Sequence, residues 1–291
     1  MSQVINTLGR TGSLVRWRKF KNSVWLIVTG FCALALLAPL CGISIYLAIK
    51  GAGALDWNFF TNIPKPVGEM GGGVANALVG SLIVVGMAAL AAIPIGIGIA
   101  VFINEFGRGS APASAFRFVC DMFNATPSIV IGIFAYSVVV LWMGRFSAIA
   151  GSFALFVMMV PVIVRGTEEI LKTVPNALRE ASLALGASQS QTVWNVILPA
   201  ALRGITTAVF LSVARVGGET APLLFTALGN DFMTLKIDQP INTLPVQIYK
   251  FASSPYQDWH RQAWAAALVL VLAISLANAG ARWLARPRTA V

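Results

Sequence analysis

Long apolar stretches recur along the chain and constrain its fold more than any other feature. A helix needs about 20 predominantly apolar residues to cross the hydrocarbon core of a bilayer. Stretches of that length lie near Val24–Ile49, Val74–Ile103, Met122–Met143, Ser147–Val164, Ile205–Leu228 and Gln262–Trp283. The sequence therefore predicts an all-α polytopic membrane protein with six transmembrane helices.

The amino-acid composition agrees with a membrane protein and argues against a nucleic-acid-binding protein. Hydrophobic residues make up 57% of the chain and charged residues only 11%, whereas a soluble domain carries about 25% charged residues. The net charge is +10, but the basic residues lie at the ends of the apolar stretches, as membrane anchors do. We expect contact with membrane lipid and no binding of nucleic acid.

The first apolar stretch follows basic residues, as in a signal peptide, but it exceeds the apolar core of about 7–15 residues that a signal peptide has. We therefore expect a retained span. The expected organisation is a cytoplasmic N-terminal segment at 1–23, a first transmembrane helix outside the core at 24–49, a transmembrane domain at 74–283 and a cytoplasmic tail at 284–291. Basic residues are more numerous in the segments that this arrangement places inside, which favours a cytoplasmic location for both termini.

Sequence motifs for catalysis, cofactor binding and metal binding are absent. No Gly-Lys dipeptide occurs, so the chain has no P-loop for ATP hydrolysis. Its one histidine, His260, has no cysteine or second histidine nearby, and its three cysteines fit small buried apolar side chains. We expect a protein that is not an enzyme and that has neither a metal site nor a cofactor.

A polar segment at 177–199 interrupts the apolar chain on the expected cytoplasmic side. Ala177–Leu185 favours a helix that Gly186 would end in a left-handed conformation. Ser188–Gln191 has the S-x-x-Q pattern of a capping box, which would begin a second short helix running to Pro199. Spacing alone predicts a helix–turn–helix, which fits either packing within the chain or docking of a partner protein.

The same segment resembles the cytoplasmic signature of the permease subunits of binding-protein-dependent ABC importers. The residues that match this signature in register are Glu180, Ala181, Gly186, Leu198 and Pro199. Ser182 replaces the second alanine of the signature, and Val196 replaces its preferred isoleucine. The resemblance implies the type I ABC importer permease fold, in which this loop forms coupling helices that seat in a groove on a separate ATPase subunit.

Arg215 lies near the middle of the predicted span at 205–228. A charged side chain at that depth is costly unless it faces the bundle interior or a watery path. Glu219 follows four residues later and is placed to pair with Arg215 on one helix face. The pair would either only lock helices together or take part in binding, with the Arg215 guanidinium offered to an oxyanion such as phosphate.

The residues after Arg215 predict a break in this span. Gly217 and Gly218 weaken a helix, and Pro222 removes a backbone hydrogen bond. Thr220 is placed to cap a new half-helix whose N-terminus would point toward mid-membrane. Transporters use such helix ends to bind anions, so this segment is a candidate anion site.

Arg215, Gly218–Ala227 and Pro127–Gly132 resemble the pattern of phosphate-specific transport permeases of the PstA type, and the similarity runs from about Ala75 to Trp283. This resemblance implies phosphate as the substrate and the bacterial inner membrane as the location. It also implies ABC ATPase subunits of the PstB type, a second permease of the PstC type and an extracytoplasmic phosphate-binding protein of the PstS type.

Several alternatives stay open at the level of the sequence. Arg165 falls where PstA-type proteins carry an arginine linked to transport, but it also fits a membrane anchor that pairs with Glu169. Asn124, Thr126 and Ser128 either line a polar pathway or form hydrogen bonds between helices. The alternative functions are an ABC permease for phosphonate or sulfate and, more remotely, an ion-coupled secondary transporter.

Overall fold

The computed structural model describes residues 2–285 of the chain, and the predicted tail at 284–291 lies outside that range from residue 286 onward. The described residues form helices, turns and loops, with no β-strand among them. The chain divides into two compact units, the first ending at Lys50 and the second beginning at Gly51. Nearly all of helix α1 (Ser2–Ala52) belongs to the first unit, and its stretch Val15–Ala52 is long and apolar enough to cross a membrane.

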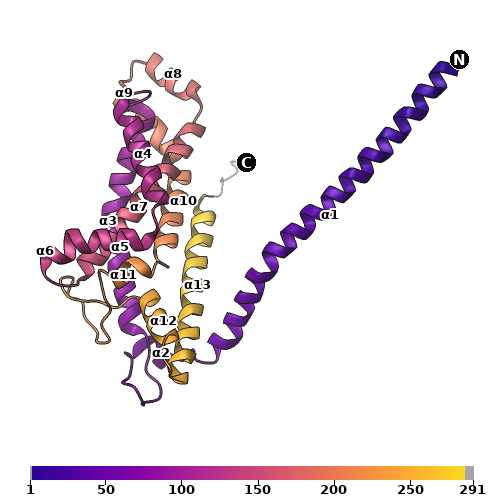
Figure 1. Ribbon diagram of the computed structural model, residues 1–291. Coiled ribbons are helices and arrows are strands. Elements are labelled where there is room, and N and C mark those ends of the chain that lie inside the picture. Colours follow the sequence, from indigo (N-terminus) through magenta and orange to yellow (C-terminus); the bar gives the residue numbers. More distant parts are fainter. Residues whose placement is uncertain (1, 286–291) are drawn as a thin grey trace. The chain divides into compact units, whose positions relative to one another are not determined.

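The second unit is a bundle of long helices with shorter ones at its two ends and partway along it (Figure 1). Its elements are α2 (Trp57–Thr61), α3 (Ala75–Val101), η1 (Phe102–Phe106), α4 (Ala111–Ala125), α5 (Ser128–Ala135), η2 (Tyr136–Val140), α6 (Leu141–Met143), α7 (Ala148–Thr173), α8 (Asn176–Ala184), α9 (Gln189–Thr192), η3 (Val193–Ile197), α10 (Leu198–Val216), α11 (Ala221–Leu224), α12 (Leu244–Ala252) and α13 (Gln257–Ala285). The three η elements are π-helical turns that continue neighbouring α-helices. In Figure 1, α8 lies at one end of the bundle, and α2 and α12 lie at the opposite end.

The packing of α3 against α7 forms the centre of the bundle. Val84, Ala88 and Ala92 of α3 are buried there against Leu155 and Met159 of α7. Small side chains on α3 let the two backbones approach closely, which is how helices associate where lipid removes the hydrophobic driving force. This packing fixes α7, and with it the polar side chains that α7 carries toward α4 and α10.

The third predicted span, Met122–Met143, is not one straight helix. α4 and the stretch Ser128–Met143 meet at an angle of 106°, with the break at Thr126 and Pro127. Thr126 is extended, with ψ at 131°, because a residue that precedes proline is pushed out of the helical conformation. The predicted span is therefore broken near its start, at the proline, and the polar residues Asn124, Thr126 and Ser128 lie around the break.

The fifth predicted span, Ile205–Leu228, is shifted toward the N-terminus. A helical stretch of 28 residues runs from Gln189 to Val216. The second short helix of the polar segment therefore does not end at Pro199, as its sequence predicts, but continues into α10. Pro199 lies in the first turn of α10, directly after η3, where the hydrogen-bond register is already shifted and the missing N–H is tolerated.

Candidate substrate pathway and coupling loop

Polar side chains from three helices surround a cavity of about 160 Å³ in the second unit. Asn124 and Thr126 come from the end of α4 and its bend, Ser128 begins α5, and Arg215 and Glu219 come from the end of α10 and the turn after it. We call this space the polar cavity. The bend after α4 and the end of α10 bring these five residues together, whereas the other two pathway candidates, Arg165 and Thr220, do not line this cavity.

Arg215 and Glu219 do not form the predicted ion pair. α10 ends at Val216, so the two side chains are not one turn apart on a common helix, as their spacing suggested. Among the residues that the structure describes, neither side chain takes part in a hydrogen bond or an ion pair, and Arg215 is exposed. The interpretation of an ion pair that only locks helices is therefore wrong, and the guanidinium donors of Arg215 are free to meet an anion in the polar cavity.

The predicted helix break after Arg215 is present, but Thr220 does not act as its side-chain cap. The backbone carbonyl of Thr220 accepts hydrogen bonds from Leu223 and Leu224, at 3.1 and 3.2 Å, while its side chain makes no capping bond. α11 has only four residues, too few to build the dipole of a longer helix. The segment therefore does not supply an anion site from a helix terminus, and Thr220 is not among the residues that line the polar cavity.

Gly132 and Pro222 bring into contact two segments singled out in the sequence, Pro127–Gly132 and Gly218–Ala227. A Cβ atom at Gly132 would lie 2.7 Å from Cα of Pro222, closer than side-chain atoms approach a backbone. α5 and α11 are thus packed backbone to backbone beside the polar cavity, which only a residue without a side chain permits. The contact holds α11, which follows the turn that carries Glu219, against the middle of α5.

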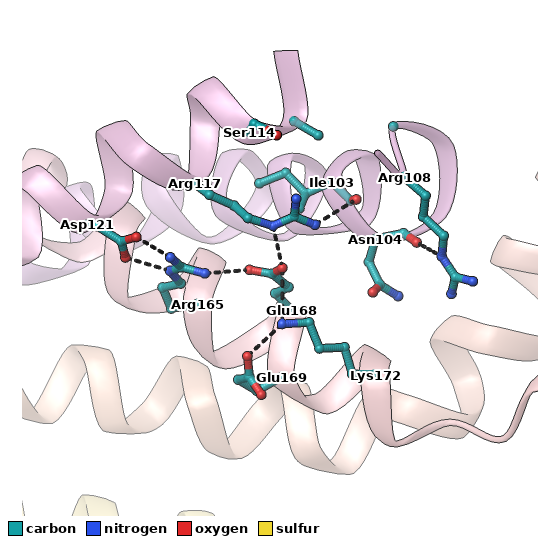
Figure 2. A network of polar contacts seen from close by, with 12 residues as sticks. Ile103, Asn104, Arg108, Ser114, Arg117, Asp121, Arg165, Glu168, Glu169 and Lys172 are labelled. Carbon is teal, nitrogen blue, oxygen red and sulfur yellow. Dashed lines mark hydrogen bonds and ion pairs between the residues drawn. The ribbon is translucent and has the colours of Figure 1, made fainter. Parts of the chain in front are cut away.

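Arg165 lies in a second polar group, the inner network, formed by Arg117, Asp121, Arg165, Glu168, Glu169 and Lys172 (Figure 2). Its Nε donates to Asp121 Oδ1 at 2.8 Å, its Nη2 donates to Asp121 Oδ2, and its Nη1 donates to Glu168 Oε2 at 3.0 Å. The predicted pair of Arg165 with Glu169 is wrong, because Glu169 pairs with Lys172 instead, at 2.8 Å. Arg165 thus joins α7 to α4 and is not a simple surface anchor.

Glu168 is the buried centre of the inner network (Figure 2). Its side chain is 0% exposed and meets Arg117 Nε at 2.7 Å and Lys172 Nζ at 3.2 Å in addition to Arg165. A buried carboxylate is tolerated only when cations and hydrogen bonds compensate its lost hydration. The three basic side chains supply that compensation and are held in place by it.

The segment at 177–199, which we call the coupling loop, begins as the sequence predicts. α8 (Asn176–Ala184) matches the predicted helix to within one residue at each end, and Gly186 follows with φ at 85°, in the left-handed region. The capping box is present, because Ser188 Oγ accepts from Gln191 N–H and the Gln191 side chain accepts from Ser188 N–H. The two parts of the loop are therefore built from local sequence signals.

The outer face of the coupling loop is exposed. Glu180 and Ala181 of the matched signature are both exposed, and Leu198 and Pro199 lie where the loop joins α10. Leu185 is 89% exposed and Trp194 is 69% exposed. Large apolar side chains exposed on a polar segment fit a protein interaction site.

Sequence reasoning missed an ion pair that anchors the coupling loop. Arg179, next to Glu180, donates to Glu105 Oε1 at 2.7 Å and Oε2 at 3.1 Å, and to the carbonyls of Leu171 and Val174. Both side chains are nearly buried, with exposed fractions of 11% for Arg179 and 5% for Glu105. The pair ties α8 to η1 at the end of α3, and the only sequence signal for it is a lone acidic residue at the end of an apolar stretch.

Comparison with known proteins identifies a matching family and several similar proteins. Residues 92–288 match the family described as binding-protein-dependent transport system inner membrane component. The phosphate transport system permease protein PstA of Haemophilus influenzae is 43% identical over 262 residues, which cover 90% of this chain and 93% of that protein. The protein of the same name from Mycobacterium leprae is 37% identical, over 93% of this chain and 91% of its own length.

Solved structures show a similar fold at low sequence identity. A chain of the MetNI methionine ABC transporter in an inward facing conformation has a TM-score of 0.61 at 22% identity and matches 73% of this chain and 94% of its own length. A chain of a bacterial alginate ABC transporter, in complex with a periplasmic protein that holds an alginate pentasaccharide, has a TM-score of 0.61 at 14% identity. That match covers 93% of this chain and 98% of the other. The bundle therefore has the fold of ABC importer permeases.

Proposed function

Because the chain belongs to the family of binding-protein-dependent transport system inner membrane components, we propose that it is a permease subunit of an ATP-driven importer of inorganic phosphate. The observation that carries the phosphate assignment is the free guanidinium of Arg215 at the polar cavity. Its planar donors match the oxygens of phosphate, and Asn124, Thr126 and Ser128 add neutral polar groups around the same space. The relatives named above, which are phosphate permeases, support the same substrate.

Phosphate passes through the polar cavity on its way across the membrane. Arg215 compensates the negative charge of phosphate, and Glu219, on the same wall, keeps that attraction weak enough for release. An ion must bind well enough to enter and weakly enough to leave. A carboxylate beside the arginine provides this balance without closing off the guanidinium.

The coupling loop is the docking site for a separate ATPase subunit of the PstB type. Glu180 and Ala181, with the exposed Leu185, form the surface that the ATPase holds. The missing P-loop makes such a partner necessary, since the chain has no other motif for ATP hydrolysis. Movement of the ATPase displaces α8, and the Arg179–Glu105 pair carries this displacement to the end of α3.

The protein is a multi-pass membrane protein, and several of its helices are long and apolar enough to cross the bilayer. With the coupling loop in the cytoplasm, both termini lie there too, as the distribution of basic residues favours. A second permease of the PstC type completes the pathway, and an extracytoplasmic phosphate-binding protein of the PstS type delivers the substrate. Alternating access then opens the polar cavity first to one side of the membrane and then to the other.

Reconstitution tests this proposal directly. The chain is expressed with its ATPase, its second permease and its binding protein, and ATP-dependent uptake of radioactive phosphate is measured in proteoliposomes. We expect uptake that unlabelled phosphate abolishes and that sulfate and phosphonate leave unchanged. Uptake of sulfate or phosphonate in place of phosphate would refute the substrate, and uptake without the ATPase would refute the ABC mechanism.

A further inference from the structure

The inner network lies next to the polar cavity, on the same faces of the same two helices. On α7, Met158 and Val162 line the polar cavity, and Arg165 follows on that face about 4.5 Å farther along the helix axis. On α4, Asn124 lines the polar cavity, and Asp121 lies about 4.5 Å from it along the axis in the same way. Both steps lead toward the end of the bundle that carries α8 (Figure 1).

Arg165 binds Asp121 as an arginine binds phosphate. Its Nε and Nη2 each donate to one oxygen of the Asp121 carboxylate, which is the two-point arrangement that a guanidinium also makes with a phosphate group. Asp121 therefore occupies the two donors of Arg165, Nε and Nη2, that would bind the transported anion.

The two carboxylates on Arg165 differ in how firmly they are held. Glu168 is 0% exposed and is also held by Arg117 and Lys172, so it stays in place and keeps Arg165 oriented. Asp121 is 56% exposed and has no other ion-pair partner among the described residues. An exposed ion pair contributes little to stability, so Asp121 is the partner that an arriving anion can replace.

We propose that Asp121 accepts hydrogen bonds from Nε and Nη2 of Arg165 between transport events and that phosphate displaces Asp121 from these donors on the way from the polar cavity to the cytoplasm. Arg165 is then a second anion-binding site. When Asp121 pairs with Arg165 again, it displaces the bound phosphate, which is released. This inference rests on the proposed function, because it takes phosphate as the anion and the coupling-loop end as the exit. The competing explanation is that the pair only ties α4 to α7, a connection that Arg117 and Glu168 already make at 2.7 Å.

The test is the variant Asp121→Asn in the complete transporter, reconstituted in nanodiscs with its binding protein. Asparagine cannot offer two equivalent anionic oxygens to Arg165, so phosphate bound there meets no competitor. We expect the phosphate retained by the complex without ATP to rise by up to about fivefold, which corresponds to an exposed ion pair of about 1 kcal/mol. The maximal rate of uptake should fall and the apparent KM should fall with it.

Two further variants identify the cause of such a change. Asp238→Asn is the matched control, because Asp238 is also exposed and also pairs with an arginine, Arg145, at 3.1 Å; we expect wild-type retention and uptake. Adding Arg165→Gln to Asp121→Asn should abolish the additional retention of phosphate, since the proposed anion-binding site is then removed. A purely structural pair would give lower uptake without any rise in retention or fall in KM.

The outcomes separate this inference from the proposed function. If Asp121→Asn leaves retention unchanged or lowers it while the wild-type complex imports phosphate, the role of Asp121 is refuted and the proposed function stands. If the wild-type complex imports no phosphate, the proposed function fails. If Asp121→Asn does not assemble, Asp121→Ser carries the same measurement, and failure of both to assemble beside a normal Asp238→Asn shows a structural role and refutes the inference.

Discussion

Removing the Arg179 side chain should release the coupling loop from the bundle. In Arg179→Ala, Glu105, which is 5% exposed in the wild type, loses two hydrogen bonds from a cation and keeps only the neutral one from Asn104. Breaking a buried ion pair from one side costs about 3–5 kcal/mol, because the remaining charge is left uncompensated. Since 1.36 kcal/mol is a factor of ten, the equilibrium for detaching α8 should shift by about 100-fold or more.

Hydrogen exchange of the α8 backbone amides, measured in the assembled transporter, reports this equilibrium directly. We expect exchange about 100-fold faster for Arg179→Ala, together with ATP hydrolysis that no longer drives phosphate uptake. Arg108→Ala is the matched control, because Arg108 reaches the same Glu105 only at 4.0 Å and is 53% exposed. Its pair is worth less than about 1 kcal/mol, so equal exchange in the two variants would refute the anchoring role of Arg179.

Two other contacts give simple predictions. Gly132→Ala would place Cβ 2.7 Å from Pro222 Cα, whereas a Cβ at Gly86 would meet nothing within 4 Å. Gly132→Ala should therefore lower the free energy of unfolding by about 1–3 kcal/mol and lower the melting temperature of the purified complex. The control Gly86→Ala should lower neither. Equal melting temperatures would contradict the close contact of α5 and α11. Leu185→Glu changes a side chain that is 89% exposed, so it should leave the permease folded and abolish co-purification of the ATPase subunit; normal co-purification would exclude this face as the docking surface.

Features that depend on neighbouring residues could be predicted from the sequence. The apolar stretches indicate membrane-crossing helices because length and composition decide that property alone. The left-handed turn at Gly186 and the capping box at Ser188 are also local, since each is formed within a few residues. The matched signature around Glu180 could be recognised for the same reason.

Features that depend on where helices bend or end were predicted less well. Gly217, Gly218 and Pro222 did predict a break after Arg215, but the predicted pair of Arg215 and Glu219 assumed a helix that runs past Val216, and the helix stops there. The angle of 106° after α4 moves Thr126 and Ser128 beside Arg215, which no spacing along the chain reveals.

Contacts between distant parts of the chain could not be predicted at all. Arg179 and Glu105 are 74 positions apart, and Arg165 and Asp121 are 44 positions apart. A single sequence places such residues on separate helices and gives no measure of the distance between them. Only the packing of α7 against α3 and α4 brings these charges together.

The most direct test of the phosphate pathway is ATP-dependent phosphate uptake by the complete transporter carrying Arg215→Ala. A hydrogen bond to a charged group is worth about 1.5–3 kcal/mol, so uptake should fall by about 10-fold to 100-fold while assembly and ATP binding stay normal. Arg203→Ala, an exposed arginine on the same helix that does not line the polar cavity, should transport like the wild type. Uptake at the wild-type rate by an assembled Arg215→Ala complex would contradict the central claim that phosphate crosses at the polar cavity.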